Sequence, residues 1–191
     1  MIRYFTVAFC LFFVGAALAF DEPKDFRGIP WEVSSDEAER LIRQQWTSRR
    51  ADGELVLDTE ITKRHWDERV KYFFFRDKLA SLPVNFGLSF LDDKFVHAEI
   101  FFKSKDFLLI ESAFKEKYGS PTTENSIPLQ TGFGVRYNGK ELRWNGPSMR
   151  IWLRQYDGKI TDGTASLRKL IFLEYLAQKD KLKKKDAAKD L

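Results

Sequence analysis

Residues 84–102 read VNFGLSFLDDKFVHAEIFF, and this stretch decides the fold. Its apolar side chains alternate before and after the central Asp92-Asp93-Lys94 turn, at Val84, Phe86, Leu88 and Phe90 and then at Val96, Ala98, Ile100 and Phe102. A period of two residues is typical of strands that bury one face and expose the other. The stretch therefore predicts an antiparallel hairpin with a single buried face.

Helices are predicted on both sides of this hairpin. Before it, Ser34 is followed three residues later by Glu37, the spacing of a capping box at a helix start. After it, Ser104 opens a helix that ends at Gly119 and Pro121, a C-cap glycine and a following proline. The apolar stripe of this second helix is Phe107, Ile110, Ala113 and Phe114.

Further strands are predicted from alternation and turn residues. In the first half they cover residues 54–61 and 69–75. In the second half, a polar loop to Gln130 precedes a hairpin in which 132–137 and 141–144 flank an Asn138-Gly139 turn. Residues 148–156 alternate cleanly, 157–166 read as a loop, and 167–176 are apolar on both faces, as in a central strand.

This order predicts an α+β fold in which two main helices pack on one face of one or more antiparallel sheets. Because a helix precedes several strands twice, the chain could contain a duplicated helix-plus-strands unit. We expect a single domain over residues 20–178, which could be divided into lobes 20–103 and 104–178. Residues 179–191 form a lysine-rich tail with few apolar groups to bury.

The first nineteen residues have the pattern of a cleaved export signal. Arg3 precedes an apolar run, and Ala17-Leu18-Ala19 is a small-x-small cleavage site before Phe20. The sequence thus predicts an exported protein, periplasmic or secreted, without a transmembrane anchor after cleavage. Two alternatives are an uncleaved anchor and lipoprotein processing at Cys10, the only cysteine. An anchor fits less well because the apolar run is shorter than the roughly 20 residues of a membrane span. Lipoprotein processing fits less well because Phe9 occupies the position before Cys10, where such sites have Gly, Ala or Ser.

Charge separates the body of the chain from its tail. The whole chain has a formal net charge of +4, yet residues 20–178 carry 25 basic and 25 acidic side chains. The positive excess lies on Arg3 in the predicted signal and on the lysines from residue 179 onward. A neutral body argues against nucleic acid as a partner, because nucleic-acid-binding proteins carry basic patches on the folded surface.

Several strings resemble a family of small exported bacterial proteins without assigned activity. They are FRGIPW at 26–31, FVHAEIFFK at 95–103, FKEKYG at 114–119 and YNGKELRW at 137–144. In plan, the chain is also similar to the helix-on-sheet modules of β-lactamase-inhibitor-like and outer-membrane-assembly proteins. The resemblance implies an α+β fold and lends no catalytic residues.

Candidate catalytic and metal-binding groups are sparse. His97 and Glu99 project from the same side of the predicted strand, either as two metal ligands or as a solvent-facing pair. Asp92 and Asp93 could serve glycoside hydrolysis only if they faced each other across a substrate, and adjacent turn residues point apart. Gly132-Phe133-Gly134 lacks the rest of a nucleotide-binding motif. We therefore expect no cofactor, no metal site and no catalytic residue.

One surface stands out as a candidate binding site. In 149–156, Met149, Ile151 and Leu153 must face the core, so their neighbours share the other side. Guanidinium and aromatic groups together bind carboxylates, phosphates and flat surfaces. The predicted patch is Arg136, Arg143, Arg150, Trp152, Arg154 and Tyr156.

The patch favours a non-catalytic binding or scaffolding module of the bacterial cell envelope. Its expected partner is an envelope protein or an anionic surface ligand. The alternative is an envelope hydrolase acting on glycan or peptide, which a deep pocket lined by carboxylates would indicate.

Overall fold

The computed structural model describes residues 20–45, 47–49, 55–57, 60–130 and 134–189. The predicted export signal, Cys10 and the Gly132-Phe133 pair lie outside the described residues. In chain order, the described elements are β1 (Asp25–Phe26), β2 (Ile29–Pro30), α1 (Ser35–Gln45), β3 (Thr47–Arg49), β4 (Leu55–Leu57), β5 (Thr62–His65), β6 (Val70–Leu79), β7 (Leu82–Leu91), β8 (Lys94–Lys103), a 3-10 turn (Ser104–Asp106), α2 (Phe107–Tyr118), β9 (Thr123–Gln130), β10 (Arg136–Asn145), β11 (Met149–Arg154), β12 (Asp162–Lys169) and α3 (Leu170–Ala187).

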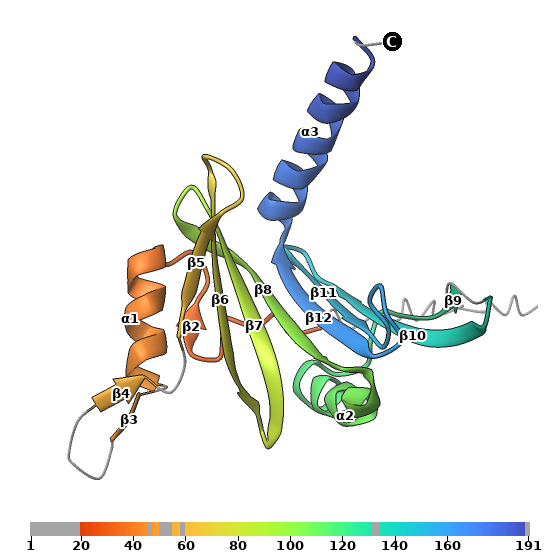
Figure 1. Cartoon of the computed structure of the whole chain (residues 1–191), viewed down its shortest axis with the longest axis horizontal. Coiled ribbons are helices and arrows are strands. Elements are labelled where there is room, and N and C mark those ends of the chain that lie inside the picture. The colour runs from red at the N-terminus through yellow and green to blue at the C-terminus, as the bar shows by residue number, and fades with distance from the viewer. Residues whose placement is uncertain (1–19, 46, 50–54, 58–59, 131–133, 190–191) are drawn as a thin grey trace, which may run out of the picture.

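The described residues form an α+β fold around one eight-stranded antiparallel sheet, as predicted. The strand order is β5-β6-β7-β8-β12-β11-β10-β9, so each half is a four-stranded meander. The last strands of the two meanders, β8 and β12, pair antiparallel at the centre. Since α1 precedes the first meander and α2 precedes the second, the topology is a helix-plus-strands unit used twice (Figure 1).

The main core lies between the sheet and two helices, α1 and α2. Helix α1 contributes Ala38 and Ile42, and it begins as predicted, with the Glu37 backbone N–H donating to Ser34 Oγ. Helix α2 contributes Phe107, Ile110 and Phe114 to the same core. The two predicted helices therefore cover one face of the sheet.

The hairpin that decides the fold is confirmed as β7 and β8. Asp92 and Asp93 form its turn, both with positive φ. One detail differs: Val96 was predicted to share the core face with Ala98, but it belongs to a second, smaller cluster. A register shift between Ser89 and Phe90 causes this, because a bulge changes the face to which the following side chains point.

Helix α2 is also confirmed, including its end. Gly119 has φ of 75° and its N–H donates to the carbonyl of Lys115, so glycine closes the helix as predicted. The indole N–H of Trp144 donates to the Gly119 carbonyl at 2.9 Å, which ties this end of α2 to β10.

Two strand predictions were wrong in their boundaries. The polar loop to Gln130 is strand β9, which pairs with β10 along its whole length. Asn138 and Gly139 lie inside β10 and form no turn. Gly139 is needed for a different reason: a Cβ there would lie 2.6 Å from the Tyr156 ring, so glycine lets that ring pack across the strand.

In the first half, only Leu55–Leu57 of the strand predicted over residues 54–61 is described as strand. It forms β4 and pairs with β3 outside the main sheet, and the edge strand β5 follows at Thr62–His65, beyond the predicted segment. The strand predicted over residues 69–75 is β6, which extends to Leu79.

The strand predicted over residues 167–176 is mostly helix. Strand β12 is central, as expected of that segment, but it runs from Asp162 and ends at Lys169. Helix α3 then extends to Ala187 and rises away from the sheet (Figure 1). Its first turns cover the face opposite α1 and α2, where Phe172 joins Val70, Leu91 and Val96 in the second cluster.

Helix α3 contains most of the lysine-rich segment, including Lys179, which was predicted as the start of the tail. Among the described residues, no helix combines the length and the apolar composition needed to cross a lipid bilayer.

Candidate functional site

The sheet face that carries α3 is covered by less helix than the opposite face. Helices α1 and α2 cover the other face, while only the first turns of α3 lie on this one. We call it the α3-side face. Its main strand residues are Tyr72, Phe74, Asn85, Gly87, Ser89, His97, Glu99, Phe101, Glu141, Arg143, Trp152, Arg154, Ser166 and Arg168.

A row of aromatic rings crosses the first half of this face. Trp66, next to β5, stacks on Tyr72 with ring centroids 5.0 Å apart, and Tyr72 stacks on Phe74 at 6.5 Å. Phe74 reaches Phe101 at 6.3 Å across β7. Gly87 makes room on β7, because a Cβ there would lie 2.2 Å from the Tyr72 hydroxyl. The aromatic row is therefore continuous, and its first member is 49% exposed.

Guanidinium groups surround Trp152 on the second half of the face. Arg154, Arg143 and Arg168 lie over its ring at 4.8, 5.0 and 5.4 Å from the centroid. Stacking of this kind orders both partners and leaves guanidinium N–H groups available to a ligand. We call Arg143, Arg150, Trp152, Arg154 and Arg168 the arginine-tryptophan cluster.

Buried carboxylates hold this cluster in place. Glu141 is 1% exposed, and it accepts from Arg154 Nε at 2.6 Å and pairs with Arg143. Glu99 lies 3.6 Å from Arg168, and burial raises the pKa of its carboxyl. Burial likewise lowers the pKa of Arg168. Asp157 is close enough to act on both Arg168 and Glu99, so four arginines face three carboxylates around Trp152, which leaves a small excess of positive charge.

His97 lies beneath the cluster and is buried, which corrects the prediction of a solvent-facing pair with Glu99. Helix α3 covers it, and its ring stacks on Phe172 at 5.1 Å. Burial holds the pKa of His97 well below its usual value, so the ring is neutral. An alternating strand pattern cannot reveal this burial, because the covering helix was itself predicted as strand.

The hydrogen bonds around His97 assign its tautomer. Arg168 Nε can only donate, and it lies 2.7 Å from Ser166 Oγ and 3.1 Å from His97 Nε2. Therefore Nε2 is an acceptor, and Ser166 donates to it at 3.0 Å. The ring proton is on Nδ1 and is donated to Ser89 Oγ at 3.1 Å. This network fixes the guanidinium of Arg168 from below.

The structure brings together most of the predicted patch. Arg143 and Arg154 each lie over the Trp152 ring, and Arg150 lines a pocket together with Arg143 and Trp152. Tyr156 packs over Gly139 and against Tyr137. Arg136 does not join them. Because β10 is continuous, Arg136 lies on the same face as the core residues Leu142 and Trp144, opposite the rest of the patch.

Sequence reasoning missed Arg168 and the aromatic row. Arg168 alternates with the buried Leu167 on β12, a signal hidden by the boundary misplaced at residue 167. Phe101 alternates with the core residues Ile100 and Phe102 in the hairpin that was correctly predicted, so that strand pattern already indicated its face.

Two pockets open on the α3-side face. The Trp152 pocket has a volume of about 200 Å³ and is lined by Arg143, Asn145, Arg150, Trp152, Ser166, Arg168 and Leu173. A pocket of about 480 Å³ at the far end of the face is lined by Pro83, Asn85, Phe101, Phe102, Lys103, Asp157, Asp162 and Gly163. Between them, the face offers polar, charged and aromatic groups over both halves of the sheet.

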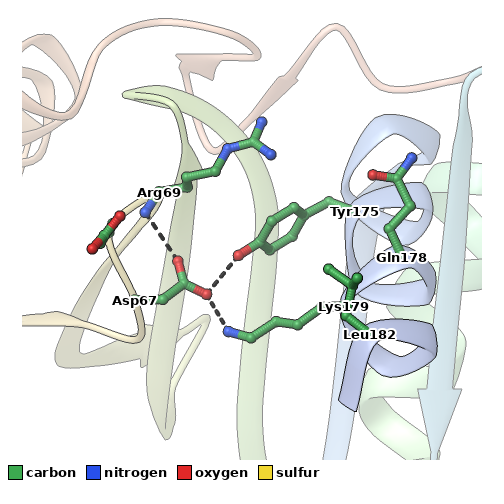
Figure 2. A pocket seen from close by; sticks show the side chains of 7 residues that line it. Asp67, Arg69, Tyr175, Gln178, Lys179 and Leu182 are labelled. Atoms are coloured by element: carbon green, nitrogen blue, oxygen red, sulfur yellow. Dashed lines mark hydrogen bonds and ion pairs between the residues drawn. The ribbon is translucent and has the colours of Figure 1, made fainter. Parts of the chain in front are cut away.

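A third pocket, of about 460 Å³, lies where α3 meets the loop between β5 and β6 (Figure 2). There Asp67 accepts hydrogen bonds from the Tyr175 hydroxyl at 2.5 Å, from Lys179 and from the Arg69 backbone at 3.0 Å. Burial opposes ionisation of Asp67, yet the bonds from Lys179 and Tyr175 outweigh it and hold the pKa of Asp67 well below its usual value. These hydrogen bonds connect α3 to the loop between β5 and β6.

Replacing Tyr175 with Phe should loosen α3 without unfolding the domain. The change deletes the hydroxyl that donates to Asp67, a loss of about 0.5 to 1.5 kcal/mol. Hydrogen exchange should show faster opening of residues 175–187 while β7 and β8 keep their protection. Tyr137→Phe, on a ring that is 36% exposed, is the matched control. Equal exchange of α3 in both variants would contradict this role of the hydroxyl.

The carboxylates of the hairpin turn serve separate partners. Asp92 accepts from Arg69 Nε at 2.9 Å, whereas Asp93 accepts from Ser35 Oγ at 2.6 Å and pairs with Lys71 at 2.8 Å. They do not face each other across a shared space. In the part of the chain that the structure describes, no group of three or more His, Cys, Asp or Glu side chains could hold a metal ion.

No protein-family model, curated protein or solved structure matches the chain. The candidate site is therefore supported by the geometry of the chain's own residues.

Proposed function

We propose that this chain is a non-catalytic binding module, exported to the bacterial cell envelope, that holds a protein partner on its α3-side face. The aromatic row is the observation that carries the proposal. Four partly exposed rings, of which Trp66, Tyr72 and Phe74 are stacked, share a face with Trp152 and its arginines, and two of the three described helices leave this face open. Aromatic residues and Arg are the types enriched in protein interfaces and in their energetic hot spots.

Charge defines the kind of partner. The arginine-tryptophan cluster carries four arginines against Glu99, Glu141 and Asp157, and the side chains of Arg143 and Arg154 are about one-third exposed. A partner with an acidic surface complements this excess, which speeds association and selects against basic surfaces.

The proposal of export rests on the predicted signal that ends at Ala17-Leu18-Ala19. N-terminal sequencing of the protein from the cell envelope tests it, and the sequence is expected to begin at Phe20.

Site-specific photocrosslinking tests the binding face. A photoreactive amino acid at Trp66 or Phe101 should crosslink to an acidic envelope protein, whereas the same group at Leu108 should not. Leu108 is 71% exposed and lies on α2, on the opposite side of the sheet. Crosslinks at Leu108 that equal those at Phe101, or none at either aromatic position, would rule out the α3-side face as the interface.

Measured affinities of variants then test whether the aromatic residues contribute to the binding free energy or merely lie close to the partner. Trp66→Ala and Phe101→Ala should each weaken binding to the crosslinked partner at least tenfold, the cost of losing about 1.4 kcal/mol. Because Trp66 is 49% exposed, its removal leaves little cavity, so thermal unfolding should remain close to that of the wild type. An unchanged affinity in both variants would contradict the proposal.

A further inference from the structure

The Trp152 pocket has the composition of a site for one small anionic group. Its charged lining consists of three arginines, Arg143, Arg150 and Arg168, and it contains no carboxylate. Trp152 and Leu173 supply apolar walls, while Asn145 and Ser166 add polar groups. The volume of about 200 Å³ accommodates a group the size of a side chain.

Each arginine of the pocket is held in position by groups beneath or beside it. Arg168 donates through Nε to Ser166 and His97, which leaves its other N–H groups free of that network. Arg150 donates to the backbone carbonyls of Gly146 and Met149. Arg143 pairs with the buried Glu141.

Arg143 also has an unsatisfied donor. Its Nε atom is buried and makes no hydrogen bond within the described residues. A buried donor without a partner is destabilising, so a small rearrangement on binding that gives it an acceptor is favoured. The fixed guanidinium groups pay little conformational entropy when they bind, which is the condition for a preorganised site.

We propose that the Trp152 pocket binds a carboxylate of the protein partner, with the guanidinium groups of Arg143, Arg150 and Arg168 as donors and Trp152 and Leu173 against the apolar part of the same residue. Planar guanidinium groups match a planar carboxylate through paired hydrogen bonds. The apolar walls favour a carboxylate attached to an apolar group over a bare inorganic anion. This inference rests on the proposed function, because it names the group by which the acidic partner is recognised.

Benzoate and benzamide provide a matched pair of probes, since they share a shape and differ in charge. In ¹H–¹⁵N NMR spectra of the protein, benzoate should shift the indole N–H resonance of Trp152 and bind at least tenfold more tightly than benzamide. Equal binding of the two, or no shift with benzoate, would overturn the carboxylate site. Tighter binding of inorganic phosphate than of benzoate would overturn the assignment to a carboxylate.

Variants then place the site. Arg150→Gln and Arg168→Gln should each weaken benzoate binding at least fivefold, whereas Arg136→Gln, on the other face of β10, should leave it unchanged. Should Arg168→Gln fail to fold, Arg150→Gln still decides, because the hydrogen bonds of Arg150 within the described residues go to backbone carbonyls. Equal effects of Arg136→Gln and Arg150→Gln would remove the site from this pocket.

The two proposals can fail separately. Crosslinking at Phe101 without benzoate binding would retain the protein interface and eliminate the carboxylate pocket. Benzoate binding without crosslinking would retain the pocket as a small-molecule site and eliminate the protein partner.

Discussion

Phe114→Ala is expected to lower the free energy of unfolding by about 3 to 5 kcal/mol. Phe114 is 5% exposed on α2, and its ring lies 5.4 Å from Tyr118 and 6.0 Å from Trp144. The change removes most of a buried ring and leaves a cavity between α2 and β10. This cavity cannot collapse easily, because the Trp144 indole is held by its hydrogen bond to the Gly119 carbonyl.

Urea unfolding monitored by tryptophan fluorescence measures this loss. Leu109→Ala is the matched control: it shortens an apolar side chain on the same helix, but Leu109 is 55% exposed, so the change should cost less than about 0.5 kcal/mol. Equal unfolding midpoints for the two variants would mean that α2 does not pack on the sheet through Phe114.

The hairpin and α2 could be predicted because their local signals agree with the tertiary structure. Alternation in 84–102 coincides with burial against two helices, and Gly119 ends α2 because only a residue without Cβ adopts its φ of 75° easily. Where local propensity, pattern and packing agree, sequence alone suffices.

The second meander was predicted less well because its turn residues serve packing. Asn138-Gly139 is the usual signal of a two-residue turn, yet Gly139 is in β10 because the Tyr156 ring lies over it. Tyr156 lies 17 residues further along the chain, just after β11, and no local pattern shows that contact. The misplaced turn also assigned Arg136 to the wrong face.

The sequence of helix α3 has a helical spacing of apolar residues, but the continuous apolar run around it also matched a central strand. Phe172, Tyr175, Leu176 and Lys179 follow a spacing of three and four residues, and the first three pack in the second cluster. A short apolar run fits a central strand equally well, so periodicity over a longer window was needed. The arginine-tryptophan half of the site was accessible from alternation, whereas the aromatic row depends on how β6, β7 and β8 pair.

The stability of the protein is expected to fall between pH 7 and pH 5 because of His97. In the folded protein, burial first and Arg168 second hold the pKa of His97 well below 6.5. The unfolded chain binds a proton near pH 6.5 that the folded His97 does not accept. Stability is therefore lost as the pH falls below 6.5, at up to about 1.4 kcal/mol per pH unit, or about 2 kcal/mol at pH 5.

Other groups near His97 act differently in this range. Glu99 lies 3.6 Å from His97 Nε2, and its pKa is raised by burial, so it opposes the trend. Asp67, Asp92 and Asp93 have lowered pKa values, and their stabilisation is lost only in more acidic solution, as the pH falls below about 4. A comparison of variants is therefore needed to isolate the histidine.

His97→Gln isolates it, because glutamine keeps hydrogen-bonding groups near Ser89 and Ser166 but does not titrate. The variant should be less stable at pH 7, since it loses the ring stacked on Phe172, yet its stability should change less between pH 7 and pH 5. His65→Gln, at an exposed position on β5, should follow the wild-type curve. Urea unfolding at half-unit pH steps measures the three slopes. If the curves of wild type and His97→Gln run parallel, the buried imidazole does not remain neutral, and Nε2 accepts a hydrogen bond from neither Arg168 nor Ser166.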